Sequence, residues 1–199
     1  MPESSLKPEM IIIAGPNGSG KTSVTKKFLH HEWASGTLYI NPDEIAKDVF
    51  GDWNSHEAVI KAANYSADLR EKCLKEHRGF VFETVMSADD KVDFIIRAKK
   101  EGFFIRLFFI STNHPTINAA RIAARVMKGG HDVPITKIIS RYYKSIGNCK
   151  MVSPIVDRLY VYDNSVDDED AKLLFRLADG NVAKIYTDEI PQWAKIILE

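Results

Sequence analysis

Met10-Ile11-Ile12-Ile13-Ala14-Gly15-Pro16-Asn17-Gly18-Ser19-Gly20-Lys21-Thr22 is the stretch that decides the fold of this 199-residue chain. Its first five residues form a wholly apolar run that ends at a glycine, which is typical of a strand buried on both faces of a parallel sheet. Residues 15–22 match the pattern GxxxxGK[ST], and a helix is predicted from Thr22 to His31. The glycines allow the backbone to curl around phosphate oxygens and to present its N–H groups to them.

The side chains of this loop suit a nucleoside triphosphate with Mg²⁺. Lys21 supplies a positive charge to the β- and γ-phosphates, and Thr22 offers a hydroxyl to Mg²⁺. The helix that begins near Lys21 adds its positive N-terminal end. We therefore predict a site for ATP, with GTP possible, formed by Gly15, Pro16, Asn17, Gly18, Ser19, Gly20, Lys21 and Thr22.

Strands and helices alternate along most of the chain. Strands are predicted at 10–14, 37–40, 80–82, 103–110 and 158–162, and helices at 22–31, 43–50, 55–77, from a cap at Ser87 or Asp89 to about 100, 115–128, 134–148 and 188–198. Residues 172–177 and 182–186 flank Asp179-Gly180 and are predicted to form a β-hairpin. The pattern indicates a three-layer α/β P-loop fold: a mainly parallel five-stranded sheet with helices on both faces, plus a C-terminal β-hairpin and helix. We expect one domain over residues 1–199, with a loose segment at 1–9.

The composition is that of a soluble globular protein, with 45% hydrophobic and 27% charged residues. Lys+Arg and Asp+Glu both number 27, and this zero balance argues against a broad surface for nucleic acid or membrane. The longest apolar runs are too short to span a bilayer, and no signal peptide is visible. We expect a cytoplasmic location and a small-molecule substrate.

Asp43 follows the second predicted strand, within Asn41-Pro42-Asp43-Glu44. In a sheet with right-handed crossovers, the carboxyl ends of neighbouring strands face the same crevice. A carboxylate there can lie opposite the γ-phosphate and accept the proton of an acceptor hydroxyl. The alternative is that Asp43 only caps the following helix, and the sequence leaves both interpretations open.

Glu83 ends the third predicted strand and is followed by Thr84. An acidic residue there can hold Mg²⁺ through water or contact an acceptor hydroxyl. Because the preceding run Phe80-Val81-Phe82 is so apolar, a carboxylate at this place needs a partner. The alternative interpretation is a solvated strand end.

Residues 115–149 are predicted to be a helical lid that is rich in cations around Gly129-Gly130. Arg121 and Arg125 are four residues apart on one helix face, and Arg141 follows in the next helix. A basic lid neutralises the charge of a transferring phosphoryl group and excludes water. The alternative is an ordinary charged helix surface. Asn164, after the fifth strand, is either a contact of the nucleotide base or a turn residue.

Taken together, these segments resemble the zeta-toxin-like P-loop kinases, in particular their stand-alone bacterial branch. The resemblance covers about residues 10–165 and is carried by residues 15–22, 41–46, 82–84, 125–134, 141–142 and 162–165. The most specific part is Gly129-Gly130-His131-Asp132-Val133-Pro134.

The resemblance implies a role for individual residues. Lys21 and Thr22 would serve ATP or GTP and Mg²⁺, and Asp43 would be the general base. Glu83 would help to hold the acceptor, with Thr84 beside it, and Arg125 would clamp phosphate. It also implies UDP-N-acetylglucosamine as the acceptor and a small helical antitoxin as a partner.

One departure from the family pattern concerns the lid. His131 stands where zeta toxins place a second lid arginine shortly before a proline, and Arg141 is the candidate to supply that charge. The residues that read uracil and sugar in zeta toxins have no assignable counterparts. Two alternative functions stay open, a kinase for a nucleotide or polynucleotide 5′-hydroxyl and a nucleotide-dependent switch or ATPase without an acceptor.

Overall fold

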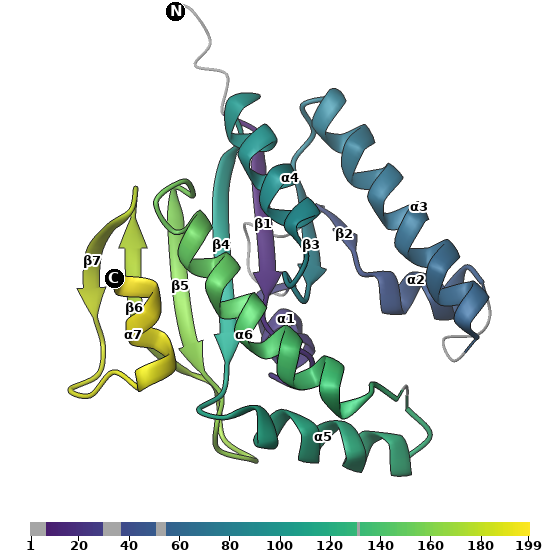
Figure 1. Cartoon of the computed structure of the whole chain (residues 1–199). Helices are drawn as coiled ribbons and strands as arrows, with labels where there is room; N and C mark the ends of the chain where they lie inside the picture. The colour runs from purple at the N-terminus through teal and green to yellow at the C-terminus, as the bar shows by residue number, and fades with distance from the viewer. Residues whose placement is uncertain (1–6, 30–36, 51–54, 131) are drawn as a thin grey trace, which may run out of the picture.

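One sheet of seven strands frames the molecule in the computed structural model, which describes residues 7–29, 37–50, 55–130 and 132–199. The strand order is β2-β3-β1-β4-β5-β6-β7 (Figure 1). The strands are β1 (Glu9–Ala14), β2 (Leu38–Ile40), β3 (Phe80–Thr84), β4 (Phe104–Ser111), β5 (Arg158–Asp163), β6 (Lys172–Ala178) and β7 (Asn181–Ile185). Every pairing from β2 through β3, β1 and β4 to β5 is parallel. Beyond β5, β6 pairs antiparallel with β5 and β7 pairs antiparallel with β6. The predicted α/β fold is confirmed, and the predicted hairpin extends the same sheet.

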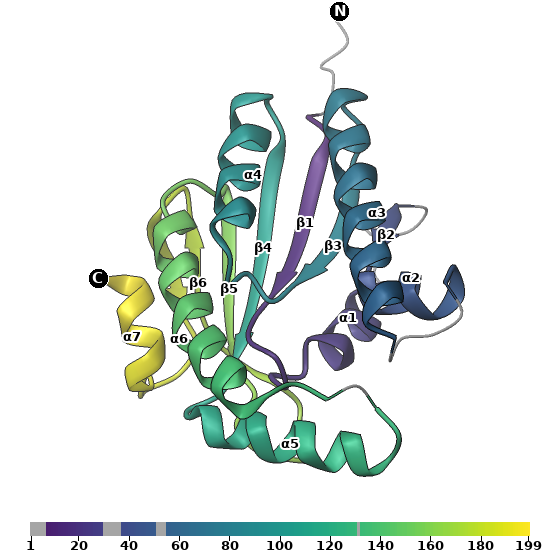
Figure 2. The same cartoon turned by 45° about the vertical axis from the view of Figure 1, so that its right-hand side comes forward.

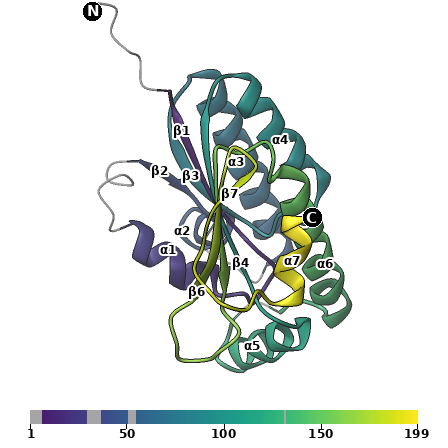
Figure 3. The same ribbon diagram turned by 90° about the vertical axis from the view of Figure 1, so that its left-hand side faces the viewer.

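Helices cover both faces of this sheet, as predicted. They are α1 (Lys21–Leu29), α2 (Pro42–Asp48), α3 (His56–Lys75), α4 (Asp89–Lys100), α5 (Pro115–Met127), α6 (Ile135–Val152) and α7 (Gln192–Leu198). The turned views in Figures 2 and 3 show α4, α6 and α7 on one face and α1 on the other. Within the described ranges, none of these helices combines the length and the apolar character needed to cross a bilayer.

The apolar run of the middle strand β1 is continuous because the strand is buried on both faces of the sheet. Met10 and Ile12 belong to the large core under α3, α4, α6 and α7, whereas Ile11 and Ile13 pack on the opposite face, near Val24 of α1. All four β1 side chains are at most 3% exposed. Successive side chains of a strand point to opposite faces, so a strand covered on both sides needs apolar residues at every position.

The start of β1 differs from the expectation. The strand begins at Glu9, one residue earlier than predicted, and Glu9 pairs with Phe104 in the register of β4. Arg106 Nε also donates to Glu9 Oε1 over 2.7 Å, which anchors this position. Residues 1–6 of the segment predicted to be loose lie outside the described residues.

The strand order gathers three chain segments at one edge of the sheet. β1 lies between β3 and β4, so the residues after Ala14, Thr84 and Ser111 leave the sheet side by side. The N–H of Gly15 donates to the carbonyl oxygen of Thr84 over 3.3 Å, which ties two of these segments together. This is the edge at which open α/β sheets bind ligands.

Candidate active site

The glycine-rich loop connects β1 to α1 in a conformation that its glycines make possible. Gly18 and Gly20 have φ of 76° and 87°, values that favour glycine. At Gly15 the constraint is space, because an added Cβ would lie 1.9 Å from the carbonyl oxygen of Ile110 in β4. The loop is therefore folded tightly against the sheet, and α1 begins at Lys21.

We predict that Gly15→Ala destabilises the protein by about 1–3 kcal/mol or more, because the methyl group collides with backbone that cannot move aside. The matched control is Gly147→Ala in α6, where an added Cβ meets nothing within 4 Å. That change should stabilise the protein by up to about 1 kcal/mol, because alanine is the better helix former. Urea denaturation of both variants measures the two effects. Equal stabilities of the two variants would contradict the tight packing at Gly15.

Lys21 turns its ammonium group back over the loop. Its Nζ donates to the carbonyl oxygens of Gly15 over 2.9 Å and of Pro16 over 3.1 Å. Burial lowers the pKa of Lys21 from its ordinary value. Both carbonyl oxygens are uncharged partners, so an anionic phosphate is the stronger partner for this ammonium group.

Three of the other predicted site residues act electrostatically on Lys21. The carboxylates of Glu83 and Asp43 raise its pKa against the effect of burial, and the guanidinium of Arg125 lowers it further. These residues come from β3, α2 and α5. The fold thus brings two acids and two cations, predicted from separate motifs, into one electrostatic neighbourhood.

Glu83 is buried at the end of β3, with only 7% of its surface exposed. Its Oε1 accepts from Thr25 Oγ1 over 3.1 Å, and its Oε2 accepts from Tyr39 OH over 2.9 Å and from Asn41 Nδ2 over 2.8 Å. Burial and the Glu83 carboxylate together raise the pKa of Tyr39. The carboxylate therefore has the partners that its apolar surroundings require. The alternative interpretation of Glu83 as a solvated strand end is wrong, because the residue is buried.

Asp43 lies in the first turn of α2, and its side chain is exposed. The cap of this helix is Asn41, whose Oδ1 accepts from the N–H of Asp43 over 3.0 Å. Asp43 therefore contributes its backbone to the cap, and its carboxylate is not the capping group. This leaves the carboxylate available to a ligand near Lys21.

Thr84 closes β3 and supports the turn that follows. Its Oγ1 accepts from the N–H of Met86 over 3.0 Å, and its carbonyl oxygen accepts from Gly15. The predicted role of Thr84 in contacting an acceptor stays a prediction.

The helical region at 115–149 is joined to the phosphate loop by two contacts to Asn17. Asn118 Nδ2 in α5 donates to the carbonyl oxygen of Asn17 over 2.6 Å, and Arg141 Nη1 in α6 donates to its Oδ1 over 3.3 Å. Arg141 thus lies beside the loop. Tyr142, next along α6, is buried in the main core, so this helix belongs to the body of the molecule.

Arg125 lies near the exposed end of α5, and its carbonyl oxygen accepts from the N–H of Gly130 over 3.0 Å. A Cβ at Gly130 would come within 2.6 Å of Arg125 Cγ, so the second glycine gives room to the arginine stem. His131, the other predicted lid residue here, lies outside the described residues.

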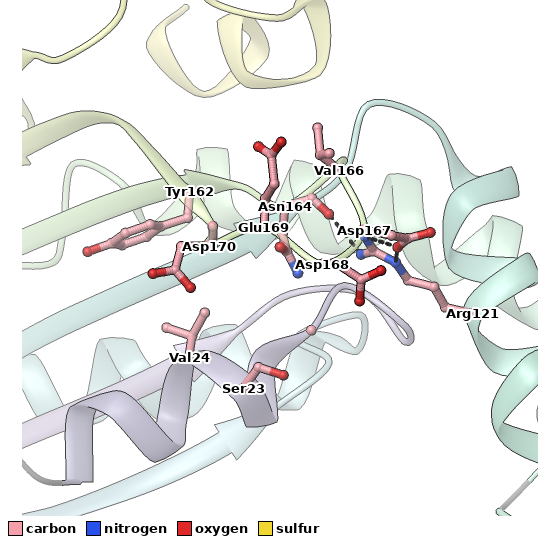
Figure 4. Close-up of a pocket in the computed structure, with 12 residues that line it drawn as sticks. Ser23, Val24, Arg121, Tyr162, Asn164, Val166, Asp167, Asp168, Glu169 and Asp170 are labelled. Atoms are coloured by element: carbon pink, nitrogen blue, oxygen red, sulfur yellow. Dashed lines mark hydrogen bonds and ion pairs between the residues drawn. The ribbon is translucent and has the colours of Figure 1, made fainter. Parts of the chain in front are cut away.

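Arg121 faces a cavity of about 470 Å³ between α1 and the loop after β5. Its Nε donates to Asp167 Oδ1 over 2.7 Å, and its Nη1 donates to the carbonyl oxygen of Asn164 over 2.8 Å. Figure 4 shows this guanidinium at one end of the cavity, with Tyr162 and Val24 at the other. Arg121 and Arg125 share a helix face in sequence, yet Arg121 is held by the β5–β6 loop.

Asn164 holds the phosphate loop in place through a side-chain hydrogen bond. Its Nδ2 donates to the carbonyl oxygen of Ser19 over 2.8 Å, and its backbone N–H donates to the carbonyl oxygen of Ser111. It also lines the cavity, so the predicted place near a nucleotide base is compatible with this supporting role. The acidic run at 167–170, which follows, is exposed and forms one wall of the cavity.

Comparison with known proteins identifies the family. A family model described as zeta toxin matches residues 1–173. The chain belongs to the zeta toxin family. It is therefore a P-loop kinase, an ATP-binding phosphotransferase, as the resemblance predicted.

Relatives of this zeta toxin family member include an uncharacterized protein of Haemophilus influenzae, 32% identical over 132 residues, which are 66% of this chain and 91% of the relative. Solved structures confirm the fold. The PezAT toxin–antitoxin system of Streptococcus pneumoniae matches with a TM-score of 0.62 and 15% identity over 98% of this chain and 85% of that one. The AvrRxo1-ORF1:-ORF2 complex with ATP matches with a TM-score of 0.65 and 18% identity over 90% of this chain. The chain spans 61% of that longer protein.

The residues of this zeta toxin family member fit a Mg²⁺ ion that arrives with the nucleotide. Thr22, the second residue of α1, has an exposed side chain next to Lys21, and its hydroxyl is a ligand that Mg²⁺ accepts. Among the described residues, no group of three or more His, Cys, Asp or Glu side chains is placed to hold a metal. An ion bound between phosphates needs only one or two protein ligands, so a single hydroxyl is a sufficient fit.

Sequence reasoning did not anticipate several residues that hold the site together. Thr25, Tyr39 and Asn41 surround Glu83, and Asn118 reaches the phosphate loop. Asn41 stood next to a candidate and could have been selected as a cap before Pro42. The others contact the site only through tertiary structure, and no local pattern marks them.

Proposed function

We propose that this kinase transfers the γ-phosphoryl group of ATP, bound with Mg²⁺, to a hydroxyl group of a small molecule. The observation that supports the proposal most is the grouping of Asp43, Glu83 and Arg125 around Lys21. Phosphoryl transfer needs positive charge beside the phosphates and a carboxylate beside the attacking hydroxyl, and this neighbourhood supplies both.

Each side chain then has one task. Asp43 orients the acceptor hydroxyl and accepts its proton, because its exposed carboxylate is free of the helix cap. Lys21, Arg125 and Arg141 stabilise the negative charge that spreads over the transferring group. Mg²⁺, when bound at Thr22, would neutralise part of the phosphate charge.

The nucleoside of ATP is proposed to occupy the cavity between α1 and the β5–β6 loop. Gly20 and Ser23 line it at the end nearest the phosphate loop, and Tyr162 and Val24 offer apolar surface to a base. The cavity volume of about 470 Å³ falls within the usual range for a small-molecule site. In this arrangement Arg121 contributes to nucleotide binding through a guanidinium that Asp167 holds in place.

The acceptor is proposed to be a UDP-activated sugar such as UDP-N-acetylglucosamine. Membership of the zeta toxin family supports this choice. A small antitoxin is the proposed protein partner, since the similar PezAT proteins form a toxin–antitoxin system. Such a partner would suppress phosphoryl transfer in its complex with this chain.

The test is a transfer assay with labelled ATP, Mg²⁺ and three sets of acceptors: UDP-sugars, nucleosides and short oligonucleotides with a free 5′-hydroxyl. We expect label on a UDP-sugar and none on the other two sets. Label on the oligonucleotides would replace the proposal with a polynucleotide kinase. ATP hydrolysis with no labelled acceptor in any set would favour an ATPase or switch.

A further inference from the structure

Both carboxylate oxygens of Glu83 are hydrogen-bonded in this structure. Its two oxygens accept hydrogen bonds from three side chains: Thr25 on α1, Tyr39 on β2 and Asn41 directly after β2. These hydrogen bonds place Glu83 where it can orient the three side chains that donate to it.

The neighbour that matters most is Asn41, which is itself only 6% exposed. Its Nδ2 donates to Glu83 Oε2 and to Tyr39 OH, and its Oδ1 accepts from the N–H of Asp43. A carboxylate can only accept hydrogen bonds when ionised, so it determines which end of the amide faces it. The hydrogen bond to Glu83 thereby turns the amide oxygen of Asn41 towards α2.

The other side of Glu83 reaches the phosphate loop. Thr25 Oγ1 lies 3.1 Å from Glu83 Oε1 and 3.0 Å from the carbonyl oxygen of Lys21, one helical turn earlier. Through Thr25 and Asn41, one carboxylate is linked to the start of α1 and to the start of α2. These are the elements that carry Lys21 and Asp43.

We infer that Glu83 is a positioning residue, which fixes Asp43 relative to the phosphate loop by orienting Asn41. The inference rests on the proposed function, in which Asp43 is the base. It differs from the role that the resemblance implied, because Glu83 acts through Asn41. Misplacement of a reacting group by about 1 Å can cost about 10²-fold in rate, so such a link has a measurable effect.

The decisive experiment exchanges the carboxylate of Glu83 and the amide of Asn41. Glu83→Gln alone places an amide against the donors of Asn41 and Tyr39. Adding Asn41→Asp restores a donor facing an acceptor, since the new amide can donate to the new carboxylate. Tyr39 OH lies 2.9 Å from Asn41 Nδ2, so it can donate to that carboxylate too, and aspartate is an equally good helix cap. The pair then keeps its charge, its hydrogen bonds and its cap.

Two measurements are made on each variant. Hydrogen exchange of the amides at 43–48 reports whether α2 is held, and transfer from ATP to UDP-N-acetylglucosamine reports kcat and the two KM values. We expect Glu83→Gln to speed exchange and to lower kcat about 10²-fold, with KM for ATP little changed. The double variant should return both exchange and kcat to near the original values. Glu57→Gln, an exposed change on α3, is the matched control.

Two results would overturn the inference. If the double variant recovers slow exchange but not kcat, Glu83 itself contacts the acceptor or the ion. If Glu83→Gln leaves exchange at 43–48 unchanged, the carboxylate does not position α2. Absence of transfer in the unmodified enzyme would instead count against the proposed acceptor, and the exchange data would still decide whether Glu83 holds Asp43 in place.

Discussion

Replacing Lys21 by methionine is expected to lower kcat for phosphoryl transfer by about 10³-fold. The ammonium group donates to two carbonyl oxygens of the phosphate loop, so its removal takes a positive charge from the place where the phosphates are proposed to bind. Folding should not suffer, because burial disfavours the charged form of Lys21 and methionine needs no such desolvation. Single-turnover transfer and thermal denaturation together measure both effects.

The control for this prediction is Lys75→Met. Lys75 lies exposed in the last turn of α3, which leads into the start of β3, at the edge of the sheet opposite the loop. It should leave kcat within about twofold, as expected for a surface substitution. A comparable loss of transfer in both variants would mean that general charge, and not the position of Lys21, supports the reaction. A Lys21→Met protein that unfolds would contradict the argument from burial.

Asp43→Asn is expected to lower kcat by about 10²- to 10⁴-fold while ATP affinity stays nearly constant. Asparagine keeps the shape of the side chain but cannot take up the proton of the acceptor hydroxyl. The helix cap survives, because it uses the backbone N–H of residue 43 and the side chain of Asn41. Loss of a negative charge at the helix start should cost no more than about 1 kcal/mol of stability.

Asp48→Asn is the matched control, because Asp48 is an exposed aspartate of the same helix, in its last turn. Transfer kinetics and the affinity for a fluorescent ATP analogue are measured side by side for the two variants. Transfer by Asp43→Asn at the original rate would remove Asp43 as the base and shift attention to another group near Lys21.

Local patterns predicted the fold well because its key features are local. The apolar run before Gly15 indicated a doubly covered strand, and the turn Asp179-Gly180 indicated a hairpin. In the structure both turn residues have positive φ, of 49° and 78°, and β6 and β7 pair antiparallel around them. Each of these features is decided by a few adjacent residues, whose conformational preferences the sequence displays directly.

The site was only partly predictable, because its side chains are positioned by contacts between distant parts of the chain. Helical spacing put Arg121 and Arg125 together, but Asp167, which follows β5, draws Arg121 into the cavity wall. The carboxylate of Glu83 could be predicted to need partners, yet the identity of those partners depends on how α1, β2 and β3 meet. Contacts of this kind join residues that are far apart in the chain and leave no periodic signal.

The position of β1 also has a consequence for synthesis of the chain. Met10 pairs with Phe80 and with Ile105, so this strand must wait for two partners that emerge from the ribosome much later. Gly15, packed against Ile110, reaches its final conformation only when β4 is in place. Pairings between distant segments form slowly. A nascent chain of this topology therefore acquires its nucleotide site late, after residue 111 is available, and stabilisation by ATP cannot assist any earlier step.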